Sequence, residues 1–167
     1  GMAVLAAAGV LAGVYACADE PDTSRGFRAE QGCMLFFNNH PWLFTVTEPF
    51  DPARFEYTYK VYTHIYDPET DLLLTKGPGG KFTHHRGLFI GWKQTAVDGA
   101  VYDTWHMKAP GVKGGRASFQ ELVRWIERSE NGTSATQKAE IVWCDAESRN
   151  AFIQETRQIT VREQDGR

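Results

Sequence analysis

Between residues 27 and 162 the chain alternates apolar and polar positions with a period of two, not the 3.6 of a helix. The clearest case is residues 55–66, where aromatic or aliphatic side chains stand at 55, 57, 59 and 61 and mostly polar ones stand between them. Such alternation is typical of a strand with one buried face. No segment after residue 24 has the spacing of an amphipathic helix over a convincing length. The pattern predicts an all-β protein.

Turn signals separate these runs and indicate how the strands connect. Asn131-Gly132 is a strong hairpin signal, and Pro49 and Pro52 mark a loop because proline cannot donate to a central ladder. The sequence therefore predicts an antiparallel β-sandwich of meandering hairpins over residues 27–167. Nothing follows its three long last strands to close them, which indicates the N-terminal portion of a longer, incomplete domain. The predicted strands are residues 27–30, 34–37, 42–47, 55–66, 72–75, 86–92, 101–107, 117–128, 136–145 and 151–162.

The first residues form a different segment. Residues 2–16 are a continuous small and apolar run that is too short to span a bilayer comfortably, and it ends before Cys17 as the apolar part of a signal peptide does. Residues 1–18 therefore predict a signal peptide, or a lipoprotein signal with the lipid anchor at Cys17, and residues 19–26 predict a solvated tether. A buried core helix is the alternative for the apolar run. We expect an exported protein, periplasmic or attached to the outer membrane, with no membrane contact except that anchor.

Composition narrows the classes of partner. The 167 residues are 42% hydrophobic and 13% aromatic, which indicates a globular protein with a real core. The net charge is −3 and no basic stripe is present, so we expect no nucleic-acid partner. Three cysteines lie far apart without a CxxC pair, which does not suggest a zinc ribbon or thioredoxin chemistry. Cys33 and Cys144 are predicted core residues, with a disulfide between them as the alternative.

Candidate chemistry gathers in two short segments about twenty residues apart. A glycine-rich loop at residues 77–80 leads into His84, His85 and Arg86, and residues 102–108 follow with a third histidine. An imidazole oriented by a carboxylate suits acid–base catalysis, a guanidinium suits sugar hydroxyls, and indole faces suit stacking of a sugar ring. We predict catalytic roles for His84, His85, His106 and Asp103, and substrate binding by Arg86, Trp92, Trp105 and Lys108.

Other interpretations of these residues stay open. On a regular strand His84 and His85 would point to opposite faces, so they can share a pocket only if residues 83–85 are loop. His85, His106 and Asp103 could instead form the facial ligand set of a metal such as non-haem iron, which is the less favoured alternative. The histidines could also be partly buried and hydrogen-bonded, with Trp105 in the core and Asp103 capping a turn. No cofactor is predicted under the acid–base interpretation.

The run from His84 to Trp92, His-His-Arg-Gly-Leu-Phe-Ile-Gly-Trp, followed by Asp-Thr-Trp-His-Met at residues 103–107, resembles a bacterial family labelled "methane oxygenase PmoA". The resemblance covers roughly residues 27–162. The labelled family often has His-Pro-His-His-Arg-Gly, whereas Phe82-Thr83 precede the histidine pair here, which weakens any site of three histidines. The label names a membrane enzyme subunit with several spans, and nothing after residue 16 can form one.

The resemblance implies a galactose-mutarotase-like β-supersandwich, a fold whose members bind or process sugars. Members of the labelled family are typically secreted or lipid-anchored, and usually longer than this chain. The expected function is therefore carbohydrate binding, or acid–base chemistry on a sugar by the His/Arg/Asp cluster. A metal-dependent oxygenase and a non-catalytic envelope binding module are the alternatives.

Overall fold

The computed structural model describes residues 32–37, 39–108, 113, 115–131 and 133–162. The predicted signal segment 1–18, the tether 19–26, Cys17 and the predicted strand 27–30 lie outside the described residues. No helix in the described ranges is long and apolar enough to cross a membrane. Export and lipid attachment stay predictions from the sequence.

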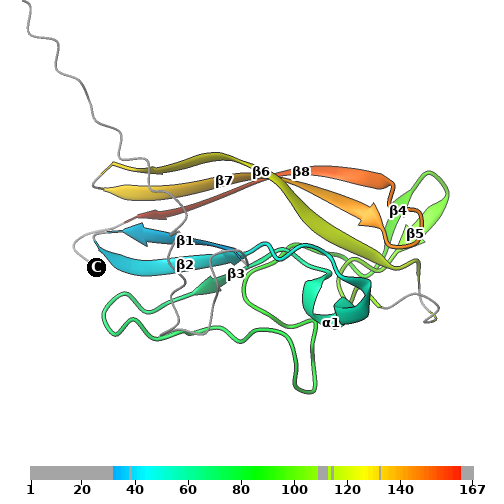
Figure 1. Ribbon diagram of the computed structural model, residues 1–167, viewed down its shortest axis with the longest axis horizontal. Coiled ribbons are helices and arrows are strands. Elements are labelled where there is room, and N and C mark those ends of the chain that lie inside the picture. The colour runs from blue at the N-terminus through cyan, green and yellow to red at the C-terminus, as the bar shows by residue number, and fades with distance from the viewer. Residues whose placement is uncertain (1–31, 38, 109–112, 114, 132, 163–167) are drawn as a thin grey trace, which may run out of the picture.

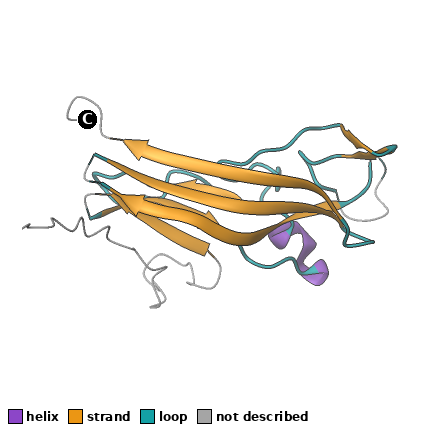
Figure 2. Ribbon diagram, turned by 90° about the horizontal axis from the view of Figure 1, so that it is seen from above, coloured by secondary structure: helices purple, strands orange, loops and turns teal. Residues whose placement is uncertain are grey.

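Two antiparallel three-stranded sheets form the two layers of the structure (Figure 1). The short sheet contains β1 (Gly32–Phe37), β2 (His40–Val46) and β3 (Tyr62–Ile65), in that order. The long sheet contains β6 (Ser118–Glu130), β7 (Ser134–Asp145) and β8 (Ala151–Arg162), with β7 in the centre. A separate hairpin of β4 (Thr95–Val97) and β5 (Ala100–Tyr102) lies at one end of the long sheet (Figure 2). The predicted all-β, sandwich-like fold class is confirmed.

Apolar side chains fill the space between the layers. On one side Leu35, Phe37 and Leu43 of the short sheet pack with Ala135 and Ile159 of the long sheet. A larger cluster joins the segment after β2 to β6 and β7, and includes Phe50, Phe55, Tyr59, Val61, Phe119, Ile141 and Trp143. Phe50 and Phe119 stack with their ring centroids 4.0 Å apart. Cys33 and Cys144 are both buried and no disulfide joins one to the other, which confirms the prediction that they are core residues.

The predicted strand at residues 55–66 is wrong in its first half. Pro52–Arg54 is a 3-10 turn (η3) and Phe55–Thr58 is a short helix, α1. Asp51 caps this start by accepting a hydrogen bond from the amide of Ala53, and proline is well suited to the first helical position. Phe55 and Tyr59 are buried whereas Tyr57 is 50% exposed, so the buried positions are four residues apart. The aromatic alternation concealed this helical spacing.

Three other predicted strands are mostly loop. Residues 72–75 and 86–92 each make one isolated bridge, Leu73 with Tyr66 and Leu88 with Thr63. The predicted strand 101–107 is β5 at its start and a turn from residue 104 to residue 106. The sequence analysis missed β4, which Asp98-Gly99 connects to β5; both residues have positive φ, as tight hairpin turns require.

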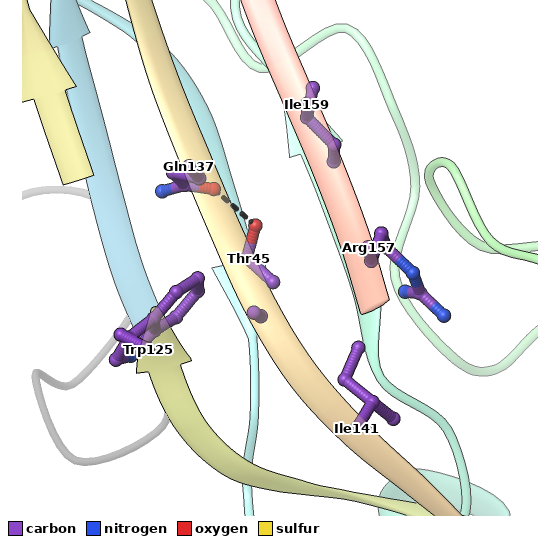
Figure 3. A pocket seen from close by; sticks show the side chains of 7 residues that line it. Thr45, Trp125, Gln137, Ile141, Arg157 and Ile159 are labelled. Carbon is purple, nitrogen blue, oxygen red and sulfur yellow. Dashed lines mark hydrogen bonds between the residues drawn. The ribbon is translucent and has the colours of Figure 1, made fainter. Parts of the chain in front are cut away.

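A small cavity lies between the two layers, beside a hydrogen bond that links them (Figure 3). Its volume of about 10 Å³ is enough for at most one water molecule. Thr45 on β2 donates a hydrogen bond of 2.8 Å to Gln137 on β7 beside it, and Trp125, Ile141, Arg157 and Ile159 also line it. This hydrogen bond links the two sheets and satisfies polar groups that the core would otherwise leave unpaired.

Candidate functional site

The structure brings the three predicted histidines of the two segments together. The ring centroids of His84 and His85 are 4.2 Å apart, and those of His84 and His106 are 4.6 Å apart. His85 is exposed and His84 is partly exposed, while the side chain of His106 is 34% exposed. We call His84, His85 and His106 the histidine cluster.

The first segment is a turn, and this is why two adjacent histidines share one side of the molecule. The amide of His85 donates to the carbonyl of Phe82 at 3.1 Å, which closes a turn over residues 82–85. Lys76 holds the preceding glycine loop closed, because its amine donates to the carbonyls of Gly79 at 2.7 Å and Phe82 at 2.9 Å. The alternation that would separate two neighbours on a strand therefore does not apply here.

The second segment orients His106 by a carboxylate. Asp103 is only 3% exposed, and its Oδ1 accepts from the backbone amide of His106 at 2.9 Å. The same carboxylate pairs with Nδ1 of the His106 ring, at 2.8 Å from Oδ2. An ionised carboxylate only accepts, so Nδ1 donates and Nε2 stays on the far side of the ring for other partners. Asp103 thus caps the turn and also fixes the tautomer of His106.

The electrostatic surroundings keep His84 uncharged. The pKa of His84 is lowered to about 4, first by partial burial and then by the nearby His85, His106 and Lys60, while Asp103 acts in the opposite direction. His84 is therefore a neutral imidazole at pH 7. A neutral ring has one donor and one acceptor, so it can give or take a hydrogen bond from a bound molecule.

Lys60 belongs to this site, and the sequence analysis missed it. It is 3% exposed, its amine lies 3.6 Å from the ring centroid of Phe89, and it donates to the carbonyl of Trp105 at 2.7 Å. The pKa of Lys60 is lowered to about 6, mainly by burial and also by the charges of Arg86 and Arg157, against the influence of Asp103. In the sequence it stood only as a polar position in an alternating run, and nothing there signals burial.

Arg86 is buried beneath the histidine turn and supports it from the protein interior. It is 1% exposed, and its guanidinium donates at 2.8 Å to each of the carbonyls of Thr83 and Glu56. The guanidinium also lies 4.4 Å from the ring centroid of Tyr59. These contacts tie the histidine turn to α1. The predicted contact of Arg86 with a sugar hydroxyl is therefore not open to it, because its donors face the protein interior.

The two predicted stacking residues have different surroundings. Trp105 is 37% exposed, and its ring lies 6.4 Å from the ring of His85, so it borders the cluster. Trp92 is 55% exposed and packs on Trp143 of β7 at 5.9 Å. Within the described residues no ring contact joins Trp92 to a histidine. Phe82, which was not predicted, is 49% exposed and lies 5.3 Å from the ring of His85.

Two predictions remain, a substrate contact by Lys108 and a metal site. The amine of Lys108 donates at 3.0 Å to the carbonyl of Lys113, and no contact between described residues joins it to the histidine cluster. Among the described residues no group of three or more His, Cys, Asp or Glu side chains is arranged to hold a metal ion. The metal set of His85, His106 and Asp103 considered from the sequence is not among such groups and stays a prediction.

Gly87 follows the histidine turn and lets the backbone there approach Thr63 of β3 closely. Its φ is +40°, and a Cβ on it would collide with the carbonyl oxygen of Thr63. Gly87→Ala is expected to lower the free energy of unfolding by about 2–4 kcal/mol, measured by urea denaturation. Gly99→Ala is the matched control, because Gly99 also has positive φ (+79°) but has nothing within 4 Å of such a Cβ. It should cost about 1 kcal/mol, and equal losses at the two glycines would contradict the close approach.

The chain matches a family model over residues 41–167, which includes Lys60 and every residue of the histidine cluster. That model describes a family of unknown function, DUF6807. The chain belongs to the DUF6807 family. No curated protein and no solved structure matches it. The resemblance to the PmoA-labelled family and to mutarotase-like proteins stays a prediction, so a function for this DUF6807 domain has to be argued from its own residues.

Proposed function

We propose that the histidine cluster performs acid–base chemistry on a carbohydrate. The observation that carries the proposal is the pairing of His106 with the buried carboxylate of Asp103, at 2.8 Å, beside two further imidazoles. This arrangement gives His106 a fixed tautomer and a basic Nε2, which are the requirements for a general base. The neutral imidazole of His84 supplies the hydrogen bond that steadies the reacting hydroxyl.

Two exposed aromatic rings support a sugar as the substrate class. Phe82 and Trp105 both lie near the ring of His85, with ring centroids 5.3 Å and 6.4 Å from it. Flat apolar faces beside polar groups suit a sugar ring, which has apolar C–H faces and polar edges. In this proposal Asp103 acts as a positioning residue, His84, His85 and His106 touch the substrate, and Arg86 and Lys60 hold the site from within.

The test is to measure turnover of reducing sugars, by polarimetry, and of oligosaccharides, by release of reducing ends. His106→Gln is expected to lower kcat by about 100-fold or more, because it removes the base. Asp103→Asn is expected to lower kcat strongly with a smaller change in KM, because it disturbs the tautomer of His106. His40→Gln is the control, since His40 is exposed and pairs only with Asp71 at 3.4 Å among the described residues.

The outcomes separate the alternatives. Equal kcat values in His106→Gln and His40→Gln would contradict the catalytic proposal. Calorimetric binding of oligosaccharides without turnover by the wild type would instead identify a non-catalytic binding module, for which Phe82 and Trp105 supply the stacking surface. Melting temperatures of the variants within a few degrees of the wild type exclude unfolding as the cause of a loss.

A further inference from the structure

A hollow whose lining includes no residue of the histidine cluster lies between the β4–β5 hairpin and the turn that joins β7 to β8. Its volume is about 250 Å³. Tyr102 and Asp103 are sequence neighbours, yet Tyr102 lines this hollow whereas Asp103 pairs with His106. The lining residues are Val97, Asp98, Ala100, Tyr102, Arg116, Asp145, Ser148, Asn150, Ala151 and Phe152.

Asp145 builds the frame of the hollow and has no capacity left for a ligand. Its Oδ1 accepts from the amides of Glu147 at 3.0 Å and Ser148 at 2.9 Å. Its Oδ2 accepts from the hydroxyl of Tyr102 at 3.2 Å and from Nε of Arg116 at 2.8 Å. Burial alone would raise the pKa of Asp145, but these donors outweigh it and hold the pKa below its usual range. Both oxygens are thus fully used as acceptors.

Other polar groups of the hollow remain available. The Arg116 side chain is 49% exposed and only its Nε is paired, so its two terminal NH₂ groups have no acceptor among the described residues. The carboxylate of Asp98 and the side-chain amide of Asn150 likewise have no hydrogen-bond partner within the described part of the chain, and both residues are exposed. Arg116 thus offers donors, Asp98 offers acceptors, and the side-chain amide of Asn150 offers both.

The balance of charge and size selects the ligand class. One guanidinium and two carboxylates line the hollow, which disfavours an anion. A calcium ion needs six or more oxygen ligands, and with Asp145 saturated Asp98 is the one carboxylate left. The volume lies below the range typical of drug-sized ligands, so a single small ring fits. Hydroxyl groups both donate and accept, and can satisfy Arg116, Asp98 and Asn150 together.

Apolar surface completes the match. Phe152 stacks on Tyr102 with centroids 4.0 Å apart and planes 5° apart, which fixes the position of its ring at the hollow. Val97, Ala100 and Ala151 add small apolar side chains to the lining. We propose that this hollow binds a neutral polyhydroxylated molecule of the size of one sugar ring, separately from the histidine cluster.

The test uses NMR titration of the isotope-labelled full chain with the methyl glycosides of glucose, galactose and mannose. Parallel titrations use myo-inositol, glycine, inorganic phosphate and calcium chloride. The proposal expects a glycoside or myo-inositol to shift amide signals at residues 97–102, 116 and 145–152. A preference between glycosides and myo-inositol distinguishes a sugar from a free cyclic polyol.

Two variants locate the binding. Asp98→Gly removes the carboxylate at a residue whose φ of +47° glycine adopts freely, and Arg116→Lys keeps the charge that faces Asp145 but removes the planar fork. Each is expected to weaken binding by about tenfold, as loss of a hydrogen bond to a charged group does. Asp71→Gly lies at another residue with positive φ, and His85→Ala lies in the histidine cluster. Both should leave the affinity measured from the amide signals of the hollow within about twofold, in line with ordinary surface substitutions.

Three results would overturn the proposal. The first is no shift in the three ranges with any glycoside or with myo-inositol. The second is affinity that is unchanged in both Asp98→Gly and Arg116→Lys. The third is a response of these residues only to glycine, phosphate or calcium. His85→Ala alters the histidine cluster but not the hollow. The affinity of the hollow can therefore be judged even if the histidine-cluster proposal fails.

Discussion

Lys60→Met is expected to stabilise the protein at neutral and acidic pH, although it removes a buried hydrogen bond. The amine of Lys60 has one acceptor among the described residues, the carbonyl of Trp105, and lies near the rings of Phe89 and Tyr59. The charges of Arg86 and Arg157 also disfavour its protonated form, and the carboxylate of Asp103 favours it. An ammonium has three donors, so its charged form is poorly compensated there. This explains why burial lowers the pKa of Lys60 to about 6 from 10.5.

The sign of the pH dependence follows from these two pKa values. Below pH 6 the amine is protonated in both the folded and the unfolded state, and the cost of burying it is greatest. Between pH 6 and 10.5 the unfolded state binds more protons, so the contribution of Lys60 to the free energy of unfolding becomes more favourable as pH rises. Each pKa unit corresponds to about 1.4 kcal/mol, and losing the hydrogen bond costs about 1–3 kcal/mol. At pH 7, about 3.5 units below 10.5, burying the amine in its neutral form costs about 5 kcal/mol, so the net gain for methionine is expected to be about 2–4 kcal/mol.

Urea denaturation at several pH values between 5 and 9 measures this effect. The stability difference between Lys60→Met and the wild type should be largest at the acidic end and should shrink toward pH 9. Lys93→Met is the matched control at an exposed lysine and should change the free energy of unfolding by less than about 0.5 kcal/mol at every pH. Destabilisation by Lys60→Met at pH 6, or a pH-independent difference, would show that the buried amine is well compensated.

Arg86→Met should have the opposite result, a loss of about 3–5 kcal/mol in the free energy of unfolding. Unlike the amine of Lys60, the guanidinium of Arg86 is bonded to the carbonyls of Thr83, Glu56 and Tyr57 and lies over the ring of Tyr59. Methionine would remove the donors that these carbonyls have in the guanidinium. It would also release the histidine turn from α1, so the proposed turnover should fall with stability.

Arg54→Met is the control for this prediction. Arg54 pairs with Glu48 at the surface, and its guanidinium lies 5.9 Å from the ring centroid of Tyr57, so it also combines an ion pair with an aromatic contact. Its side chain is 51% exposed, and its loss should cost no more than about 1 kcal/mol. Circular dichroism melting of both variants checks the difference, and a comparable small shift for Arg86→Met would refute the structural role of that guanidinium.

The sequence predicted best where local signals and burial agree. Residues 118–162 form three long strands because alternating side chains meet a packed layer, and the turn around Asn131 is held by its own side chain, whose oxygen accepts from the amide of Ser134 at 2.9 Å. At residues 55–58 the local signals conflicted. The cap by Asp51 and the proline at position 52 started a helix, whereas alternating aromatics suggested a strand.

The candidate site was predicted in part, for a related reason. His84, His85, His106 and Asp103 carry their chemistry in residue type and spacing, and the flexible glycine loop correctly indicated that two adjacent histidines can share a side. The roles of Lys60 and Arg86 depend on burial by segments distant in sequence, such as Phe89 and α1. Residue type suggested for Arg86 an exposed ligand contact, and only the packed structure makes it an internal support.

The histidine cluster stands on segments that contribute little to the two layers of the sandwich. Between β3 and β4, residues 66–94 contain no strand. They join the rest of the fold through isolated bridges, the carbonyl contacts of Arg86, a few aromatic packings and single hydrogen bonds such as that from Gln120 to the carbonyl of Ile90. Substitutions at the exposed His85, Phe82 or Trp105 therefore remove few core contacts. Such a division between scaffold and exposed loops favours evolvability: the exposed side chains around the histidine cluster can change between descendants while the same sandwich is inherited.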